Sequence, residues 1–238
     1  MENVGWIGGG CAQPVVIKEA LKALADGKPR LVRISPTAVP EDGILDYTMT
    51  CHVKAAKRGE ALDPLAPSWK LHLALLHYYL RNYAAAEEEY RQLTRSNPDL
   101  PGPHLGLYDI YSRTGKEADA IKELQQGLAL QGATELAAAL PSKYASSGFP
   151  AAKEFATREQ IRILTEASKH DYISPIALAT NYAVLDEKDN AFEWLEKAYE
   201  ERAPGLLDLD LDPDYDNLRN DKRFDDLKRR IKAFSPLL

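Results

Sequence analysis

The sequence predicts an all-α protein made of antiparallel helix pairs that stack side by side. Three observations lead to this fold class. Proline-terminated segments recur at a spacing of about 34 residues, the interval between Pro64 and Pro98. Apolar residues within these segments follow helical spacing, and small residues such as Ala86 and Ala120 recur at the same offset. Proline and glycine stand between the apolar stretches, where helices are expected to end.

Composition and charge exclude several classes of protein. The chain has 238 residues, of which 45% are hydrophobic, and this is ample for a core. Its net charge of -6 comes from interspersed acidic and basic residues, so no basic face for nucleic acid is expected. No apolar run approaches the roughly 20 residues that span a bilayer, and the first residues lack a secretory signal. Cys11 and Cys51 fit a reducing compartment. We therefore expect a cytoplasmic protein without membrane insertion.

Residues 1–53 fit no repeat and are interpreted as an irregular or partly disordered leader. The stretch QPVVIKEALKALADG predicts a short helix that ends at Gly27, and PRLVRISP predicts a brief strand. The glycines of GWIGGGC suggest a phosphate loop, but the lysine and hydroxyl of that motif do not follow at the required spacing. A flexible leader is the favoured interpretation.

Residues 54–202 carry the helical repeats. HVKAAKRGEALDP is interpreted as the second helix of an early unit. In the next unit, Leu73, Leu76 and Tyr79 lie along one face of the first helix, and Ala86 is small enough for the second helix to approach. The following unit repeats this plan with Gly115 at the turn, a residue that tolerates a left-handed conformation. The same offset also joins Leu73 to Leu107, His77 to Tyr111 and Tyr90 to Leu124.

A later unit, ISPIALATNYAVLDEKDNAFEWLEKAYEER, repeats the plan, with Pro175 in its first turn. Its packing positions are Leu178, Ala179, Tyr182, Ala191, Leu195 and Ala198. The interval from Ala120 to Ala191 is a little longer than two repeat spacings, so one slightly long unit fits between them. That unit contains an interior Pro141 and an elongated second helix, and we interpret it as a degenerate repeat.

The regular period, the small residues at fixed positions and the terminal prolines resemble the tetratricopeptide (TPR) repeat family over residues 54 to 202. The tryptophan that this family places in its first helix is absent. The resemblance implies a curved solenoid whose first helices line a concave groove for a peptide or a partner helix. The tail after the last repeat resembles the segment that ends TPR regions in bacterial regulatory proteins.

The resemblance also implies which residues line the groove. They are Leu71, Leu75, Tyr78, Tyr79, Leu105, Asp109, Ser112, Arg113, Ile176 and Thr180. The lysine and asparagine with which chaperone-binding members hold a terminal carboxylate are missing. Because the groove is mostly apolar at one end, we expect it to be covered by a partner peptide, a second copy of the chain, or the chain's own leader.

Residues 203–238 are interpreted as an acidic loop followed by a capping helix. Leu207, Leu209 and Leu211 alternate with aspartates, which predicts an extended segment with one packed side. Asp212, which precedes Pro213, or Asp216 is expected to cap a short turn, and Asp221 is expected to cap a helix over about residues 222–234. Phe224, Leu227, Ile231 and Phe234 form an apolar stripe that predicts cover for the end of the last repeat.

The Asp208–Asp216 cluster has a second interpretation, as a divalent-metal site such as calcium. A calcium loop that begins at Asp210 would use Asp210, Asp212, Asp214 and Asp221, but Tyr215 stands where glycine is required. The favoured interpretation is helix capping with no metal or other cofactor.

Common catalytic motifs are absent: the chain contains no G-x-S-x-G, H-E-x-x-H or C-x-x-C sequence. The sequence therefore favours a noncatalytic protein-interaction scaffold with a protein or peptide partner, and a homo-oligomer is compatible with it. Two alternatives remain open, a metal-dependent hydrolase that uses the Asp208–Asp216 cluster and a detached sensor domain of a bacterial regulator.

Overall fold

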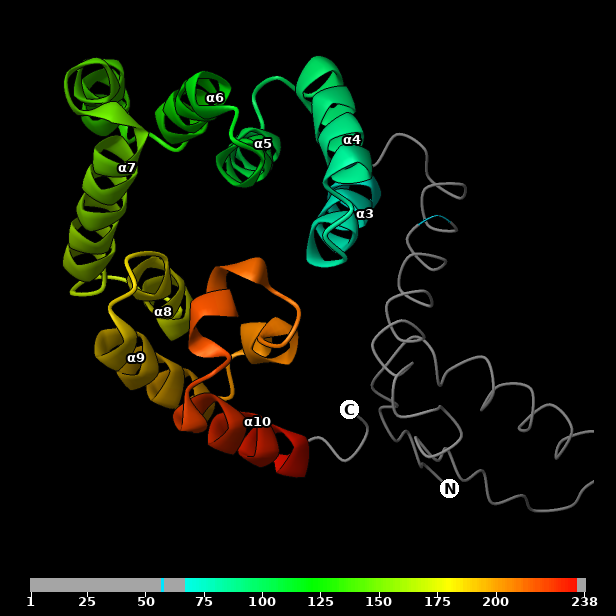
Figure 1. Ribbon diagram of the computed structural model, residues 1–238, viewed down its shortest axis with the longest axis vertical. Helices are drawn as coiled ribbons and strands as arrows, with labels where there is room; N and C mark the ends of the chain where they lie inside the picture. The colour runs from blue at the N-terminus through cyan, green and yellow to red at the C-terminus, as the bar shows by residue number, and fades with distance from the viewer. Residues whose placement is uncertain (1–56, 58–66, 235–238) are drawn as a thin grey trace, which may run out of the picture.

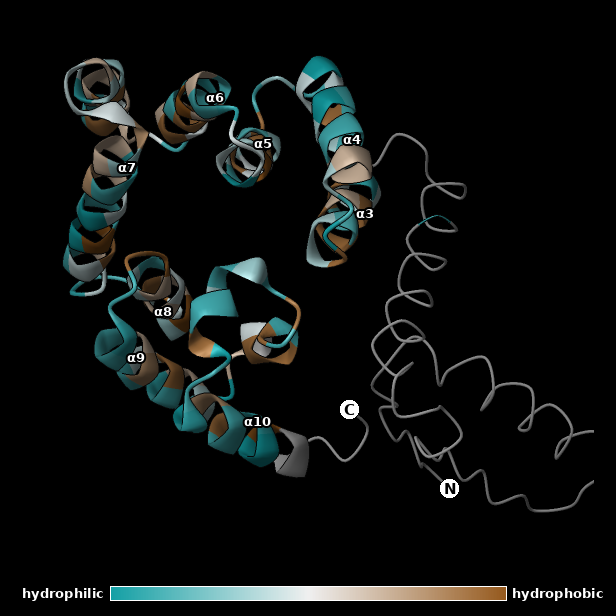
Figure 2. Ribbon diagram, viewed as in Figure 1, coloured by the Kyte–Doolittle hydropathy of each residue, from teal (hydrophilic) through white to brown (hydrophobic). Residues whose placement is uncertain are grey.

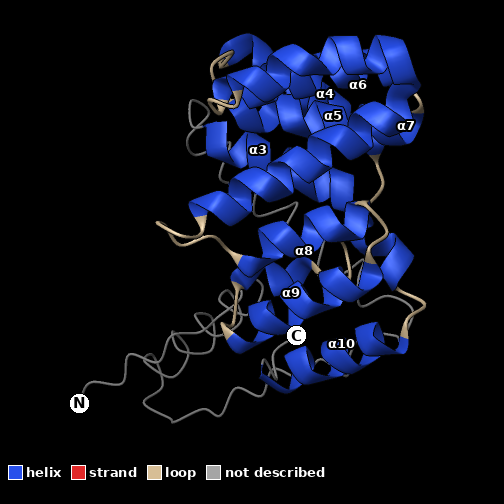
Figure 3. Cartoon of the chain, turned by 90° about the vertical axis from the view of Figure 1, so that its left-hand side faces the viewer, coloured by secondary structure: helices blue, strands red, loops and turns tan. Residues whose placement is uncertain are grey.

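The computed structural model describes residue 57 and residues 67–234. This part of the chain is all-helical and contains no strand (Figure 3). Its elements are α3 Pro67–Tyr79, α4 Tyr83–Ser96, α5 Pro101–Thr114, α6 Glu117–Leu130, α7 Thr134–Ala167, α8 Pro175–Val184, α9 Lys188–Glu200, the 3-10 helices η2 Pro204–Asp208 and η3 Pro213–Leu218, and α10 Lys222–Phe234. The all-α prediction is thereby confirmed. The expected leader and the expected helix near residues 52–64 lie outside the described residues, apart from Lys57.

The helices follow one another along a curved row from α3 to α10, and the segment with η2 and η3 lies inside the curve (Figure 1). Each helix packs on the next one in the chain, so that α3 contacts α4, α5 contacts α6 and α8 contacts α9. Short connections explain this order, because a connection of only a few residues keeps two consecutive helices close enough to pack on each other.

Three tight turns have the same hydrogen bonds at repeat-related positions. The residue that turns the chain has a left-handed backbone in each of them, with φ of 59° at Arg81, 74° at Gly115 and 58° at Asp186. The N–H of the following residue donates to a carbonyl five residues earlier: Asn82 to His77, Lys116 to Tyr111 and Glu187 to Tyr182. The intervals between these turns equal those between Ala86, Ala120 and Ala191 in the sequence. The expected left-handed Gly115 is confirmed.

The degenerate unit forms the long element α7, which breaks at Gly148. Gly148 has φ of 77° and ψ of 176°, a conformation that residues with a side chain rarely adopt. Pro141 lies within the first helical part and Pro150 begins the second, where a missing N–H costs little. The expected order of helix, turn and helix is therefore present, and the turn is reduced to a single glycine.

Two large hydrophobic cores lie along the described helices. The first joins α3 to α7 and includes Ala86, Leu107, Ile110 and Leu124. The second joins α8, α9, η2, η3 and α10 and includes Leu195. All five of these side chains are buried. Hydrophilic residues cover much of α4 and α10, as expected for helices with one packed and one solvated face (Figure 2).

Glycine permits a close helix contact in the first core. A Cβ atom on Gly106 of α5 would lie 2.4 Å from the ring of Tyr90 on α4. A Cβ atom on Gly127 of α6 would lie 2.7 Å from Leu105. Real Cβ atoms do not approach other atoms this closely, so the large side chains of one helix pack directly on the backbone of the next.

The acidic segment is helical, so the expected extended conformation of Leu207, Leu209 and Leu211 is wrong. Pro204–Asp208 forms η2 and a turn follows it. A 3-10 helix has three residues per turn, and this places Leu206 and Leu209 on one buried side. Leu207 is left 52% exposed. Burial in this segment therefore follows the three-residue spacing of Leu206 and Leu209 and not the alternation of leucine and aspartate.

The caps and the last helix were predicted correctly. The side chain of Asp212 accepts a hydrogen bond from the N–H of Asp214 at 3.0 Å and caps η3. Asp221 accepts from the N–H of Arg223 at 2.9 Å at the start of α10, which spans Lys222–Phe234. Phe224 of this helix is buried in the second core, as are Leu227 and Ile231. The α10 helix therefore covers the end of the α8–α9 pair (Figure 3).

Candidate functional site

The segment of residues 204–218, which contains η2 and η3 and is called the acidic tail below, meets the first helix pair through Arg81. Nη1 of Arg81 donates to the carbonyl of Leu211 at 2.7 Å, and Nη2 donates to Oδ1 of Asp216 at 2.8 Å. Leu211 itself packs with Leu73 and Leu76 of α3. Arg81 is the left-handed residue of the α3–α4 turn, so the turn of the repeat also positions this guanidinium. The chain is brought back to α3 from a point 130 residues later.

A second arginine contacts the tail from α5. Nε of Arg113 donates to the hydroxyl of Tyr78 at 2.8 Å, and Nη2 donates to Oδ1 of Asp214. Tyr78 is buried, whereas the Arg113 side chain is 27% exposed and that of Asp214 is 19% exposed. This partly buried pair therefore links α3, α5 and η3 at a single point.

The α8 helix holds the other side of the tail. The hydroxyls of Thr180 and Tyr215 share a 2.7 Å hydrogen bond, and Tyr215 is buried in the second core. Nδ2 of Asn217 donates to the carbonyl of Ala183 at 2.8 Å. Residues 211–217 therefore lie between α3 and α5 on one side and α8 on the other.

A cavity of about 220 Å³ lies beside this segment. Its walls come from five elements, α5, α6, the second part of α7, α8 and η3. The lining residues are Leu105, Tyr108, Asp109, Ser112, Arg113, Leu124, Lys153, Ala156, Thr157, Gln160, Thr180, Asn181, Val184 and Asp214. Leucine, alanine and valine side chains stand among charged and amide groups, a mixture that is typical of small-ligand sites.

Two charged groups of the cavity have no partner among the described residues. Asp109 on α5 and Lys153 on α7 form no side-chain hydrogen bond or ion pair with them, although the charge of Lys153 acts on Asp109. Burial and the nearby negative charge of Asp214 raise the pKa of Asp109 well above its usual range. A carboxylate at this position would gain from a bound cation.

Asp212 experiences the same environment. Burial is the largest cause, and repulsion from Asp214 adds to it; together they raise the pKa of Asp212 to about 7. The hydrogen bond from the N–H of Asp214 and the charge of Arg113 act in the opposite direction. The acidic tail thus enters a poorly solvated region in which not all of its carboxylates are easily ionised.

The residues expected to line a groove separate into two groups. Leu105, Asp109, Ser112, Arg113 and Thr180 line the cavity. Tyr78 is buried beneath Arg113, and Leu71, Leu75 and Tyr79 are half-buried against the first core. Ile176 packs against the second core. The apolar end of the expected groove is therefore largely occupied by packing within the chain.

The sequence reasoning missed the contribution of α7. Lys153, Thr157 and Gln160 line the cavity, and they follow the three- and four-residue spacing of one helix face. This polar stripe was visible in the sequence, but the irregular length of the unit prevented it from being aligned with the other repeats. Asn181 and Asp214 were missed for a different reason, since only the fold brings the tail and α8 to the same cavity.

The aspartates proposed as metal ligands have separate partners. Asp210 pairs with Arg219 and Lys228, and Asp221 pairs with Arg223. Asp212 caps η3 and Asp214 pairs with Arg113. Within the described residues no group of three or more metal-ligating side chains comes together. The structure does not assemble the calcium loop suggested by the sequence.

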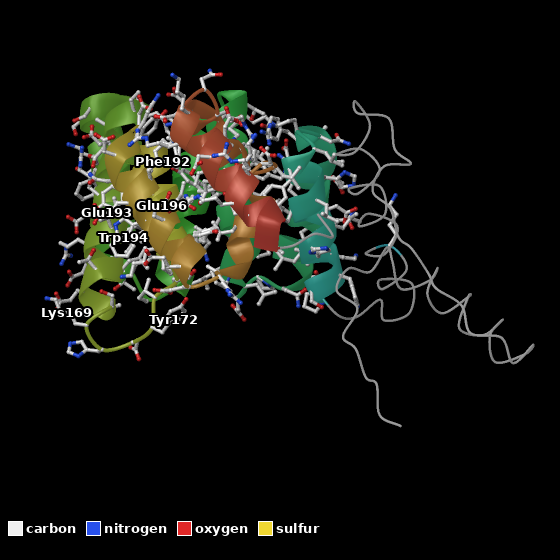
Figure 4. All side chains as sticks on the ribbon, turned by 90° about the horizontal axis from the view of Figure 1, so that it is seen from below. Lys169, Tyr172, Phe192, Glu193, Trp194 and Glu196 are labelled. Carbon is white, nitrogen blue, oxygen red and sulfur yellow. The ribbon has the colours of Figure 1, made fainter. Side chains whose placement is uncertain are left out.

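The outer side of α9 offers a different surface, shown in Figure 4. Tyr172, in the connection before α8, is 74% exposed, and its hydroxyl donates to Glu201 at 3.0 Å. The ring of Trp194 on α9 lies under Nζ of Lys197, 4.5 Å from its centroid. Charged residues stand beside both aromatic groups, so these side chains do not form a continuous apolar patch.

Comparison with known proteins yields one short match. Residues 2–35 match the model of the XdhC and CoxI family. This stretch contains the glycine run Gly8–Gly10 and lies outside the described residues. No curated protein matches the chain.

The described helices include none with both the length and the apolar character needed to cross a membrane.

Proposed function

We propose that this protein is a noncatalytic interaction scaffold of TPR-like helix pairs, in which the inner side of the helix row receives a peptide segment of a partner. The inner side is the one turned towards residues 204–218. A partner segment would lie along α5, α7 and α8 and would place one side chain or chain end in the cavity.

The observation that carries this proposal is the way in which the inner side already holds peptide chain. Arg81 and Arg113 bind the acidic tail through its carbonyl and carboxylate oxygens, and Leu211 packs on α3. Such contacts to an irregular segment are the kind with which helical scaffolds bind partners. The cavity is the open continuation of this surface.

The serine and threonine hydroxyl groups of the cavity support binding over catalysis. Ser112 donates to the carbonyl of Tyr108, and Thr157 donates to the carbonyl of Lys153. Thr180 bonds to the hydroxyl of Tyr215. Among the residues that the structure describes, no basic side chain is hydrogen-bonded to any of the three and could activate it as a nucleophile.

The test uses a variant that fills the cavity. Gln160→Trp adds volume at a lining residue whose side chain makes no hydrogen bond with the described residues, so no existing contact is lost. Lys122→Trp, on the exposed side of α6, is the matched control. Peptides selected from a random displayed library by the full chain would be labelled, and their binding to each form measured by fluorescence anisotropy.

Binding should fall at least tenfold in Gln160→Trp and remain unchanged in Lys122→Trp, because a filled cavity excludes the inserted group. The proposal fails if no peptide is enriched over the bare support. It also fails if the selected peptides bind the filled variant as well as the unmodified chain.

A further inference from the structure

The two unpartnered ionisable groups of the cavity are a carboxyl group and an amino group, and they stand on different helices. Asp109 belongs to α5 and Lys153 to the second part of α7. They interact electrostatically, yet no ion pair forms between them. The other charged pair, Arg113 and Asp214, is satisfied within the chain. An empty cavity therefore presents one free carboxyl group and one free ammonium group, held apart.

Apolar and amide groups complete the lining. Leu105, Leu124 and Val184 provide apolar surface, while Gln160 and the side-chain oxygen of Asn181 have no hydrogen-bond partner among the described residues. The volume of about 220 Å³ lies below the roughly 300–1,000 Å³ of sites for drug-sized ligands. The cavity therefore suits a compact ligand with a short apolar group.

We propose that this cavity binds a small α-amino acid with an apolar side chain, whose ammonium group pairs with Asp109 and whose carboxylate pairs with Lys153. This activity goes beyond peptide binding and does not depend on it. A zwitterion matches both groups at once, because its ammonium favours the ionised form of Asp109 and its carboxylate pairs with Lys153, whereas a simple amine or a simple acid leaves one of the two groups without a partner.

The environment of Asp109 supports this assignment. Its pKa is raised by burial first and by Asp214 second, so its ionised form lacks stabilisation in the empty cavity. A ligand ammonium supplies the missing cation. Because the cavity also contains Asn181 of α8 and Asp214 of η3, the same ligand would touch both sides of the boundary between the two hydrophobic cores.

The experiment is titration calorimetry of the full chain with alanine, valine and leucine in turn. Isocaproate and isopentylamine serve as matched probes, because each keeps the isobutyl side chain of leucine and only one of its charged groups. We expect at least one of the amino acids to bind. If leucine does, each single-charge probe should bind at least tenfold more weakly than leucine.

Two variants assign the charges. In Asp109→Asn the affinity for leucine should fall to that for isocaproate, and in Lys153→Met it should fall to that for isopentylamine. Asp119→Asn and Lys122→Met, exposed on α6, are the matched controls and should leave binding unchanged. Circular dichroism melts of all four variants check that they fold, and we expect Asp109→Asn to do so because the amide preserves the shape of a carboxyl group that is already hard to ionise.

Three outcomes would overturn the proposal. The first is the absence of binding by all three amino acids. The second is equal binding of leucine and one single-charge probe, which would make the cavity a site for amines or acids only. The third is leucine binding that survives both Asp109→Asn and Lys153→Met, which would place the ligand elsewhere.

Discussion

The first and last helix pairs, α3–α4 and α8–α9, share a plan but hold the acidic tail in different ways. Both have the same left-handed turn and the same hydrogen bonds around it. The last pair buries Leu206, Leu209, Tyr215 and Leu218 of the tail in its own core. The first pair, with α5, contacts the tail through two arginine–aspartate pairs and through a single leucine, Leu211, that packs on α3. The tail is thus an integral part of one end of the molecule and a docked segment at the other.

This difference indicates which contacts of the acidic tail are more stable and which open more easily. Hydrophobic burial contributes about 1.5–3 kcal/mol per large side chain, whereas an exposed ion pair contributes about 0–1 kcal/mol. Contacts on the α3–α5 side should therefore loosen before those on the α8–α10 side. The cavity lies at this weaker boundary, where a ligand has the greatest influence on how the two sides fit together.

The largest effect is expected on the packed side of the tail. Leu218→Ala removes a fully buried side chain from the second core and should lower the free energy of unfolding by about 2–5 kcal/mol. Leu207→Ala, in the same tail but 52% exposed, should change it by less than about 0.5 kcal/mol. Chemical denaturation of both variants measures the contrast. Equal effects would show that the tail is not packed as described.

The pH dependence tests the electrostatic environment of the tail. Between pH 4 and pH 7 the native state retains the proton of Asp212, whose pKa is about 7, while the unfolded chain has released it. The native state binds more protons in this range, so Asp212 makes the free energy of unfolding fall as the pH rises through it.

Asp212→Asn keeps a capping oxygen and removes this charge. It should stabilise the protein by up to about 4 kcal/mol at pH 8 and have little effect at pH 4, which denaturation at the two pH values measures. The raised pKa of Asp109 also makes the free energy of unfolding fall as the pH rises. The pH dependence of stability should therefore be shallower in Asp212→Asn but still present. Asp225→Asn, an exposed change on α10, should leave the slope as it is.

The partly buried pair Arg113–Asp214, on the α3–α5 side of the tail, should have a smaller effect on the free energy of unfolding. Arg113→Ala leaves the hydroxyl of Tyr78 and the carboxylate of Asp214 without their donor and should cost about 1–2 kcal/mol. A double-mutant cycle with Asp214→Asn separates the interaction energy between the two side chains from the effect of lost packing. A coupling energy near zero would mean that this contact does not hold the tail.

The exposed pair should have the smallest effect. Side chains of Arg81 and Asp216 are 36% and 46% exposed, so Arg81→Ala should cost no more than about 1 kcal/mol. The part that is due to charge should disappear at high salt, where the screening length is about 3 Å. Hydrogen exchange should then report faster opening of η3 and leave the protection of α9 unchanged. Faster exchange throughout α9 would contradict the separation of the two ends.

The sequence by itself determined the features that depend on local chemistry. Repeated apolar positions specified the helix pairs, Gly115 marked a turn, and Asp212 and Asp221 marked the caps, because each relies on residues within a few positions along the chain. Half of the expected groove residues also line the cavity, since those on α5 follow one helix face.

The tertiary structure alone decided where the tail lies and what it encloses. Leucine and aspartate alternate from Leu207 to Asp212, which predicts an extended segment, but packing against α8 and α9 selects 3-10 geometry instead. Nothing local pairs Arg113 with a residue 101 positions away. The cavity and the raised pKa of Asp109 arise from the same long-range contacts, because burial and neighbouring charge depend on how distant segments meet.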